Sequence, residues 1–180
     1  KNGDTISTAA NTKFTDIPAH AWYSGYVKYL SNNGITYGKS KTIFAPNDAI
    51  TRAEFTTMAV RFFDVYGDGD AEIMEQFSGF NDVSSGYWAA EYIKYAALHG
   101  WINGYGDGSF HADREINRAE VVTIVNRLLG READEDYIAD NLRKLNTFPD
   151  VSRKHWAYYA VMEAANAHTA VLGENESWSK

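Results

Sequence analysis

The chain has 180 residues, 44% hydrophobic and 23% charged, which is typical of a folded globular protein and excludes a disordered tail or a coiled-coil rod. The net charge of −7, from 17 basic and 24 acidic side chains, argues against a protein that binds nucleic acid. The absence of cysteine excludes disulfides and thiol catalysis. No run of about 18 apolar residues predicts a membrane-spanning helix. Aromatic residues, at 14%, exceed what a core of this size usually needs, and aromatic side chains also serve as ligand platforms.

Residues 1–13 are rich in threonine, asparagine and alanine and predict a linker. They show no signal-peptide pattern, so this end of the chain neither indicates nor excludes secretion.

The rest of the chain repeats itself. Three segments start with a phenylalanine, followed by an aspartate two residues later and a tryptophan eight residues later; they are Phe14, Asp16 and Trp22, then Phe80, Asp82 and Trp88, then Phe148, Asp150 and Trp156. The first two align without a gap at an offset of 66 residues, and the third starts 68 residues after the second and is shorter. We therefore predict a first unit over residues 14–79, a second unit over 80–147 and a partial third unit over 148–180, together forming one domain.

Each unit has the pattern of a helix, a loop and a second helix. The predicted first helix carries an apolar stripe at helical spacing, which in the first unit is Trp22, Tyr26, Val27 and Leu30. Gly34 and Gly100 follow at positions typical of a helix end, where glycine tolerates the left-handed conformation. A glycine-rich loop comes next, with Gly38 and Gly104 at equivalent positions. The fold class predicted is all-α, built from tandem helix-loop-helix repeats.

The second helix of the first two units begins with a capping-box pattern. Thr51 or Asn117 is the predicted N-cap, and Glu54 or Glu120 stands three residues later. No such motif follows in the third unit. The acidic connectors 64–79 and 130–147 either extend the second helix or cross to the next unit.

One arginine recurs in the first turn of the second helix, as Arg52 and Arg118. A cation there is mildly unfavourable, by about 0.3–1 kcal/mol, because the helix dipole is positive at that end. Its recurrence indicates a purpose. One purpose is to hold an anion together with the backbone N–H groups of the helix start. The alternative is a salt bridge to an acidic side chain of the next repeat.

The other recurring polar and aromatic residues each have two interpretations. Glu54 and Glu120 act as capping glutamates or orient the arginine. The tryptophans pack between repeats or offer a flat face to a sugar ring. Asp16, Asp82 and Asp150 cap the turn before the helix or accept hydrogen bonds from ligand hydroxyls. Gly38 and Gly104 lie in loops whose bare N–H groups could face a ligand.

The pattern does not favour an enzyme. None of the five histidines forms the i,i+4 pair of a zinc site, so neither a metal nor another cofactor is expected. A glycoside hydrolase would use a pair of carboxylates whose separation is set in three dimensions. Catalytic pairs are unique, however, whereas the polar features here are repeated, which favours repeated binding.

Taken together, the motifs Phe14 to Trp22, Gly34-Ile35-Thr36-Tyr37-Gly38 and Ile50-Thr51-Arg52-Ala53-Glu54 resemble the S-layer homology domain. The second unit matches through Phe80 to Trp88, Trp101 to Gly108 and Ile116-Asn117-Arg118-Ala119-Glu120. The resemblance covers residues 14 to about 175 and is partial in the third unit, which lacks the arginine motif. Asn117 also replaces the usual threonine.

The resemblance implies a noncatalytic bacterial cell-wall anchor, located outside the cell, in which three repeats form one pseudo-threefold helical body. Grooves between repeats would bind a secondary cell-wall polysaccharide, often through a sugar that carries a pyruvate ketal. The arginine role passes to Arg52 and Arg118, and the other family positions are the recurring tryptophans and aspartates. The partner expected is this polysaccharide, with no nucleic acid and no membrane insertion, and a monomeric module fits. The alternative function is a protein-interaction or self-assembly repeat of a surface-layer protein.

Overall fold

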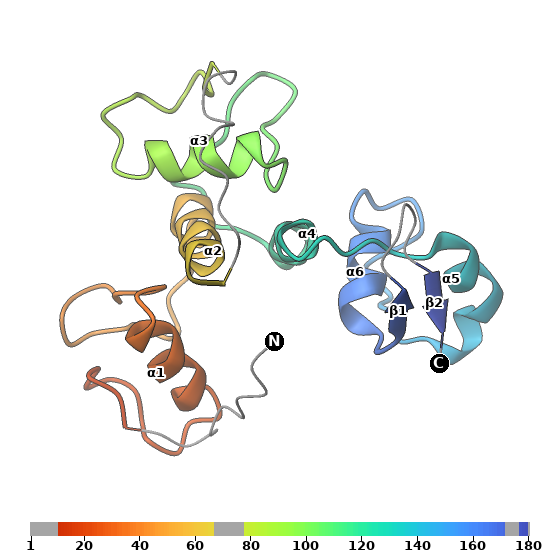
Figure 1. The fold of residues 1–180 in the computed structure, drawn as a ribbon, viewed down its shortest axis with the longest axis horizontal. Coiled ribbons are helices and arrows are strands. Elements are labelled where there is room, and N and C mark those ends of the chain that lie inside the picture. Colours follow the sequence, from red (N-terminus) through yellow and green to blue (C-terminus); the bar gives the residue numbers. More distant parts are fainter. Residues whose placement is uncertain (1–10, 67–77, 172–176, 180) are drawn as a thin grey trace.

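The computed structural model of the protein describes residues 11–66, 78–171 and 177–179 (Figure 1). Most of the predicted linker 1–13 and of the first connector 64–79 lies outside these residues. The described chain is helical, as the sequence predicts, with one small hairpin in addition. The elements are α1 (Ser24–Asn32), α2 (Arg52–Tyr66), α3 (Ala90–Leu98), α4 (Arg118–Leu128), α5 (Glu135–Asn141), a 3-10 turn (Leu142–Lys144), α6 (Tyr158–Ala165), β1 (Thr169–Val171) and β2 (Ser177–Ser179).

The predicted first helices are α1, α3 and α6, and each begins two residues after its tryptophan. Their inner faces are buried through Val27, Ile93 and Met162. The prediction that the tryptophan belongs to the buried stripe is wrong. The chain enters each helix through a turn that leaves the indole on the outside, and Trp22 is 76% exposed.

The predicted second helices are α2 and α4, and both start at the predicted arginine. Each has its capping box. In α2 the Glu54 N–H donates to Thr51 Oγ1 (3.2 Å) and the Thr51 N–H donates to Glu54 Oε2 (2.9 Å). In α4 the pair Asn117 and Glu120 does the same, at 3.0 Å in both directions. Reciprocal bonds of this kind satisfy N–H groups that a helix start otherwise leaves open.

Each second helix packs on the first helix of the next unit. The contacts join α2 to α3 and α4 to α6, and α2 also contacts α4. Figure 1 shows the result as lobes opened by α1, α3 and α6, with α2 and α4 between them. The main core, which includes Ala53, Val60, Ile93, Phe110 and Ile124, therefore combines residues of the first two units.

Backbone hydrogen bonds tie the first unit to the second at the start of α2. The N–H groups of Arg52 and Ala53 donate to the carbonyls of Arg114 and Ala112, both at 2.9 Å. The Ile116 N–H donates to the Ile50 carbonyl at 3.0 Å. These bonds hold the two helix starts close together at the centre of the molecule.

The third unit has a different second half. No counterpart of α2 or α4 follows α6 among the described residues; β1 pairs with β2 as an antiparallel hairpin instead. Trp178 of β2 is buried, and its indole stacks on the His168 ring at 3.9 Å. The second connector forms α5, capped by Asp134, whose carboxylate accepts the Tyr137 N–H (2.8 Å) and the Trp178 N–H (3.0 Å).

Candidate functional site

Two grooves occupy equivalent places in the first two units. Groove 1, of about 480 Å³, lies between the loop and second helix of the first unit and Trp88 of the second. Groove 2, of about 350 Å³, lies in the same way between the second unit and Trp156 of the third. The residues lining both, at matching positions 66 residues apart, are Thr36 and Ile102, Tyr37 and Asn103, Gly38 and Gly104, Lys39 and Tyr105, Glu54 and Glu120, Thr57 and Thr123, Met58 and Ile124, and Arg61 and Arg127.

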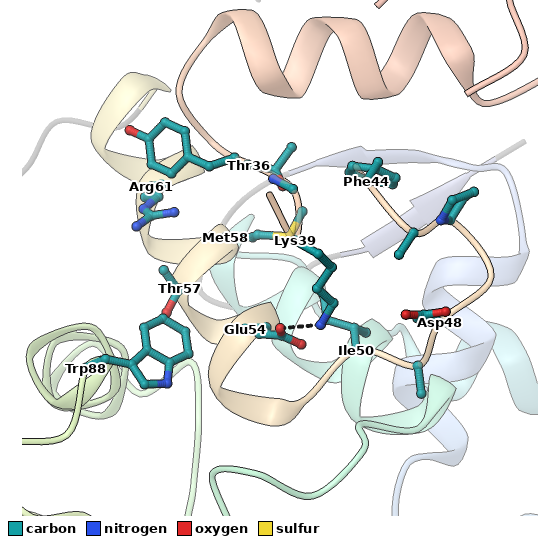
Figure 2. A pocket seen from close by; sticks show the side chains of 15 residues that line it. Thr36, Lys39, Phe44, Asp48, Ile50, Glu54, Thr57, Met58, Arg61 and Trp88 are labelled. Atoms are coloured by element: carbon teal, nitrogen blue, oxygen red, sulfur yellow. Dashed lines mark hydrogen bonds and ion pairs between the residues drawn. The ribbon is translucent and has the colours of Figure 1, made fainter. Parts of the chain in front are cut away.

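Groove 1 has an ion pair over the start of α2. Lys39 Nζ lies 2.5 Å from Glu54 Oε1, and both side chains are partly exposed. Figure 2 shows this pair on the floor of the groove, with Trp88 and Asp48 on opposite sides. Arg61 of α2 lies over the rings of Tyr37 (4.7 Å) and Tyr92 (5.0 Å), so cation–π contacts hold this guanidinium at the wall.

Groove 2 has a buried ion pair in the equivalent place. Arg52, only 5% exposed, extends from the first unit and donates from Nη1 to Glu120 Oε1 at 2.8 Å. Its Nε donates to the Phe110 carbonyl at 2.8 Å and its Nη2 to the Asn103 carbonyl at 3.3 Å. Arg114 donates to the same Glu120 oxygen and to the Tyr105 hydroxyl. Two guanidiniums thus surround one carboxylate.

The acidic partner is held in its ionised form. Burial alone would raise the pKa of Glu120, but the Asn117 N–H, the Tyr105 hydroxyl and the two arginines lower it further than burial raises it. The pKa of Glu54 is likewise lowered, since the Lys39 and Thr51 contacts outweigh burial. Both carboxylates are therefore charged at neutral pH.

Arg52 has the geometry of a salt bridge to the next repeat, with glutamate as its partner. The N–H groups at the start of α2 already have acceptors: those of Arg52 and Ala53 bond to the second unit, and those of Glu54 and Phe55 bond to Thr51. No anion can lie on them without displacing these bonds. The guanidinium still lines groove 2, where its remaining N–H donors face the space beside Trp156.

Arg118 differs from Arg52 although the two hold the same sequence position. Its side chain is exposed, outside both grooves, and has no ion-pair partner among the described residues. The third unit has no helix start to bury it. The structure does not bring Arg118 together with the other predicted residues.

The tryptophans are exposed in all three units. Trp88 is 56% and Trp156 is 65% exposed, and each forms one side of a groove. Trp22, in contrast, lines neither groove. Of the two interpretations, packing between repeats does not describe these side chains, and an accessible indole face does.

The aspartates hold the loop that follows the first helix. Asp16 accepts the N–H groups of Phe44 (3.0 Å) and Ala45 (2.7 Å), and Asp82 accepts those of Phe110 and His111, both at 2.7 Å. These bonds lower the pKa of both carboxyls, in Asp82 against the opposing effect of burial. Neither carboxylate lines groove 1 or 2, and exposed Asp150 has no equivalent contact among the described residues. Asp16 and Asp82 hold this loop rather than capping the turn before the helix.

Gly38 and Gly104 line the grooves and also make room for neighbouring rings. A Cβ on Gly38 would lie 2.5 Å from the Phe14 ring, and one on Gly104 would lie 2.4 Å from the Phe80 ring. Both positions are therefore restricted to glycine by packing, whatever their contact with a ligand.

Sequence reasoning missed the basic residues on the groove walls. Arg61 and Arg127 lie nine residues after the helix-start arginines, and Arg114 and Lys39 lie in the loops. The signal available was the offset of 66 residues between Arg61 and Arg127, which the comparison of the two units could have revealed.

The described residues contain no cluster of histidine and acidic side chains able to hold a metal ion. No helix among them is long and apolar enough to cross a membrane.

The geometry is that of a helical repeat protein with binding grooves at the junctions between units. The family model described as the S-layer homology domain matches residues 13–56 and 79–122. The chain belongs to the S-layer homology domain family, and these segments are its matched repeats. The matched residues end before the third unit.

Curated relatives cover nearly the whole chain. "Cell surface glycoprotein 1" of Acetivibrio thermocellus is 31% identical over 181 residues, covering 96% of this chain and 7% of that protein. The "Cellulosome-anchoring protein" of the same organism is 29% identical over 176 residues, covering 96% of this chain and 37% of that protein. The "Amylopullulanase" of Thermoanaerobacterium thermosulfurigenes is 33% identical over 153 residues, covering 84% of this chain and 8% of that protein. The chain thus corresponds to a small part of each.

Proposed function

We propose that the chain is a noncatalytic anchoring module that holds a larger protein at the bacterial cell surface by binding an anionic cell-wall polysaccharide in grooves 1 and 2. The observation that carries this proposal is that each groove combines an exposed tryptophan of the next unit with a guanidinium on the helix wall. An indole face suits the apolar side of a sugar ring, and a guanidinium suits a carboxylate such as that of a pyruvate ketal.

The family and its relatives support this proposal. The matched relatives include proteins named for the cell surface and for anchoring, which supports a position outside the cell at the wall. Enzymes such as the amylopullulanase match over a small fraction of their length, which fits an appended module without catalysis of its own. The three units would act as one monomeric domain, with the third unit as a partial repeat that supplies Trp156.

The affinity required is within reach of such grooves. A micromolar site needs about −8 kcal/mol. A charge-assisted hydrogen bond contributes roughly 1.5–3 kcal/mol, and ring stacking and backbone bonds add to it. Two grooves that face one polymer raise retention further through effective concentration. The net charge of −7 opposes an anionic glycan weakly, because at physiological salt charges are screened beyond about 8 Å.

A pull-down with purified wall sacculi tests the proposal. We expect binding to intact sacculi and its loss when the polysaccharide is removed by acid extraction. The double variant Trp88→Ala, Trp156→Ala should reduce retention at least about 100-fold, since each indole contributes about 1.4 kcal/mol or more. The matched control is Trp22→Ala, which removes an exposed tryptophan outside both grooves and should bind normally. Equal binding by the double variant, with an unchanged circular dichroism spectrum, would contradict the proposal.

A second function, self-assembly or binding of another protein, is favoured by Trp22, because this large apolar side chain is 76% exposed and lines no groove. It predicts association without glycan. Light scattering of the purified chain, compared with Trp22→Ala, decides between assembly and a monomer.

A further inference from the structure

The two grooves share one scaffold but differ in charge. Groove 1 is lined by Lys39 and Arg61, which are positive, and by Asp48 and Glu54, which are negative, so its charges cancel. Groove 2 is lined by Arg52 and Arg127 against Glu120. Arg114 adds a further positive charge, because it contacts the lining residues Glu120 and Tyr105. Groove 2 therefore has an excess of two positive charges, counted over these side chains.

Two structural differences account for the contrast. Asp48 of groove 1 corresponds, 66 residues on, to Arg114 of groove 2, so the charge at this loop position is reversed. Arg52 reaches groove 2 from the preceding unit, and no described residue takes the equivalent place in groove 1, whose glutamate pairs with Lys39 of its own loop.

The excess charge of groove 2 is placed where it acts strongly. The Arg52 and Glu120 side chains are 6% and 9% exposed, so solvent screens their charges little. Arg127 lies one turn from Thr123 on the α4 wall and has no ion-pair partner among the described residues. In groove 1 the equivalent Arg61 is already engaged by two tyrosine rings and bonds to the Tyr92 hydroxyl at 3.4 Å.

We propose that groove 2 is selective for a ligand group that carries a negative charge, whereas groove 1 takes an uncharged sugar ring. This inference rests on the proposed function and assigns different parts of one glycan to the two grooves. Arg127 and Arg114 are the residues that determine the selectivity of groove 2, and Asp48 is the residue that opposes it in groove 1.

Fluorine NMR can read the two grooves separately. The five tryptophans are replaced by 5-fluorotryptophan, and each resonance is assigned from a Trp→Phe variant. Trp88 then reports on groove 1, Trp156 on groove 2, and Trp22 on neither. The probes are the methyl glycoside of an N-acetylhexosamine pyruvate ketal and its methyl ester, which have the same ring but differ in charge.

We expect the acid to shift the Trp156 resonance at about ten-fold lower concentration than the ester, and both to act alike on Trp88. High salt should narrow the difference at Trp156. Arg127→Gln and Arg114→Gln should each reduce it, and Asp48→Arg should create it at Trp88. Arg118→Gln is the matched control, an exposed arginine of α4 outside both grooves, and should change nothing.

Three results would overturn the inference: equal action of acid and ester on Trp156, preference for the acid at both tryptophans, or no response of Trp156 to either probe. The proposed function is judged separately by the sacculus pull-down. Binding to sacculi without charge selectivity at Trp156 contradicts this inference alone, and loss of sacculus binding contradicts the proposed function.

Discussion

At the scale of single residues, Arg52 and Arg118 show how one motif acquires two roles. Both start a capped helix, yet the first lies buried against Glu120 and the second is exposed. The difference comes from the next unit along the chain. The second unit supplies Phe110, Asn103 and Glu120 to Arg52, whereas no equivalent helix start among the described residues of the third unit reaches Arg118.

We therefore expect Arg52→Gln to destabilise the protein by about 3 kcal/mol, at the low end for a broken buried ion pair because Arg114 remains on Glu120. Arg118→Gln should change the free energy of unfolding by less than about 0.5 kcal/mol. Urea unfolding followed by tryptophan fluorescence measures both. Equal effects of the two substitutions would contradict the distinction.

Glu120 also makes stability depend on pH. Because the folded-state pKa of Glu120 is lowered from its ordinary value of 4.5, the carboxylate stabilises the fold above that value, and this contribution is lost as the pH falls through the lowered pKa. We expect the free energy of unfolding to decline below about pH 4.5. Urea titrations between about pH 6 and 3 should show a shallower decline in Glu120→Gln, and an unchanged slope would rule out this source.

The pairing of Arg52 with Glu120 could not be predicted from local spacing, because 68 residues separate the two side chains. The same holds for the groove walls. Helical periodicity places Arg61 and Arg127 on α2 and α4, but which face meets the next unit's tryptophan depends on how the helices pack. The helix starts, in contrast, follow from short-range chemistry, since the capping box needs only residues three positions apart.

At the scale of elements, the loop before each second helix depends on close approach of its backbone to an aromatic ring. The Cβ of Ala in Gly104→Ala would lie 2.4 Å from the Phe80 ring and 2.7 Å from the Ser109 carbonyl oxygen. We expect a loss of about 2 kcal/mol in the free energy of unfolding, measured by urea denaturation.

Gly106→Ala provides the control in the same loop, because its Cβ would meet no atom within 4 Å. It should leave stability within about 0.5 kcal/mol of the parent chain. If both substitutions had the same effect, loop flexibility rather than packing would explain the glycines.

At the scale of the whole molecule, the sequence offset of 66 residues predicts repeated helices but not the way in which they exchange contacts. The Phe-to-Trp spacing marks where each unit starts, and the structure adds that α2 packs on α3 and α4 on α6. The third unit diverges because it lacks the second-helix motif, and a hairpin with buried Trp178 follows α6. That hairpin carries no pattern that the first two units could have revealed.

Joint use of both grooves makes a prediction about retention on the wall. Single variants Trp88→Ala and Trp156→Ala should each lower retention on sacculi by about ten-fold, and release from a polymer surface should speed up most when both are combined. Dissociation rates from immobilised wall polymer measure this. If one single variant already released the chain as fast as the double variant, only one groove would contribute.

The crossing of Arg52 from the first unit into groove 2 changes how such sites are counted. Each groove belongs to a junction: one unit provides its floor and the next its tryptophan, so a row of n units of this kind has n−1 grooves. Duplicating one unit adds one site, and a unit expressed alone has none. Valency is thus a property of adjacency, and a cut between α2 and α3 would cost groove 1 its indole and groove 2 its buried guanidinium at once.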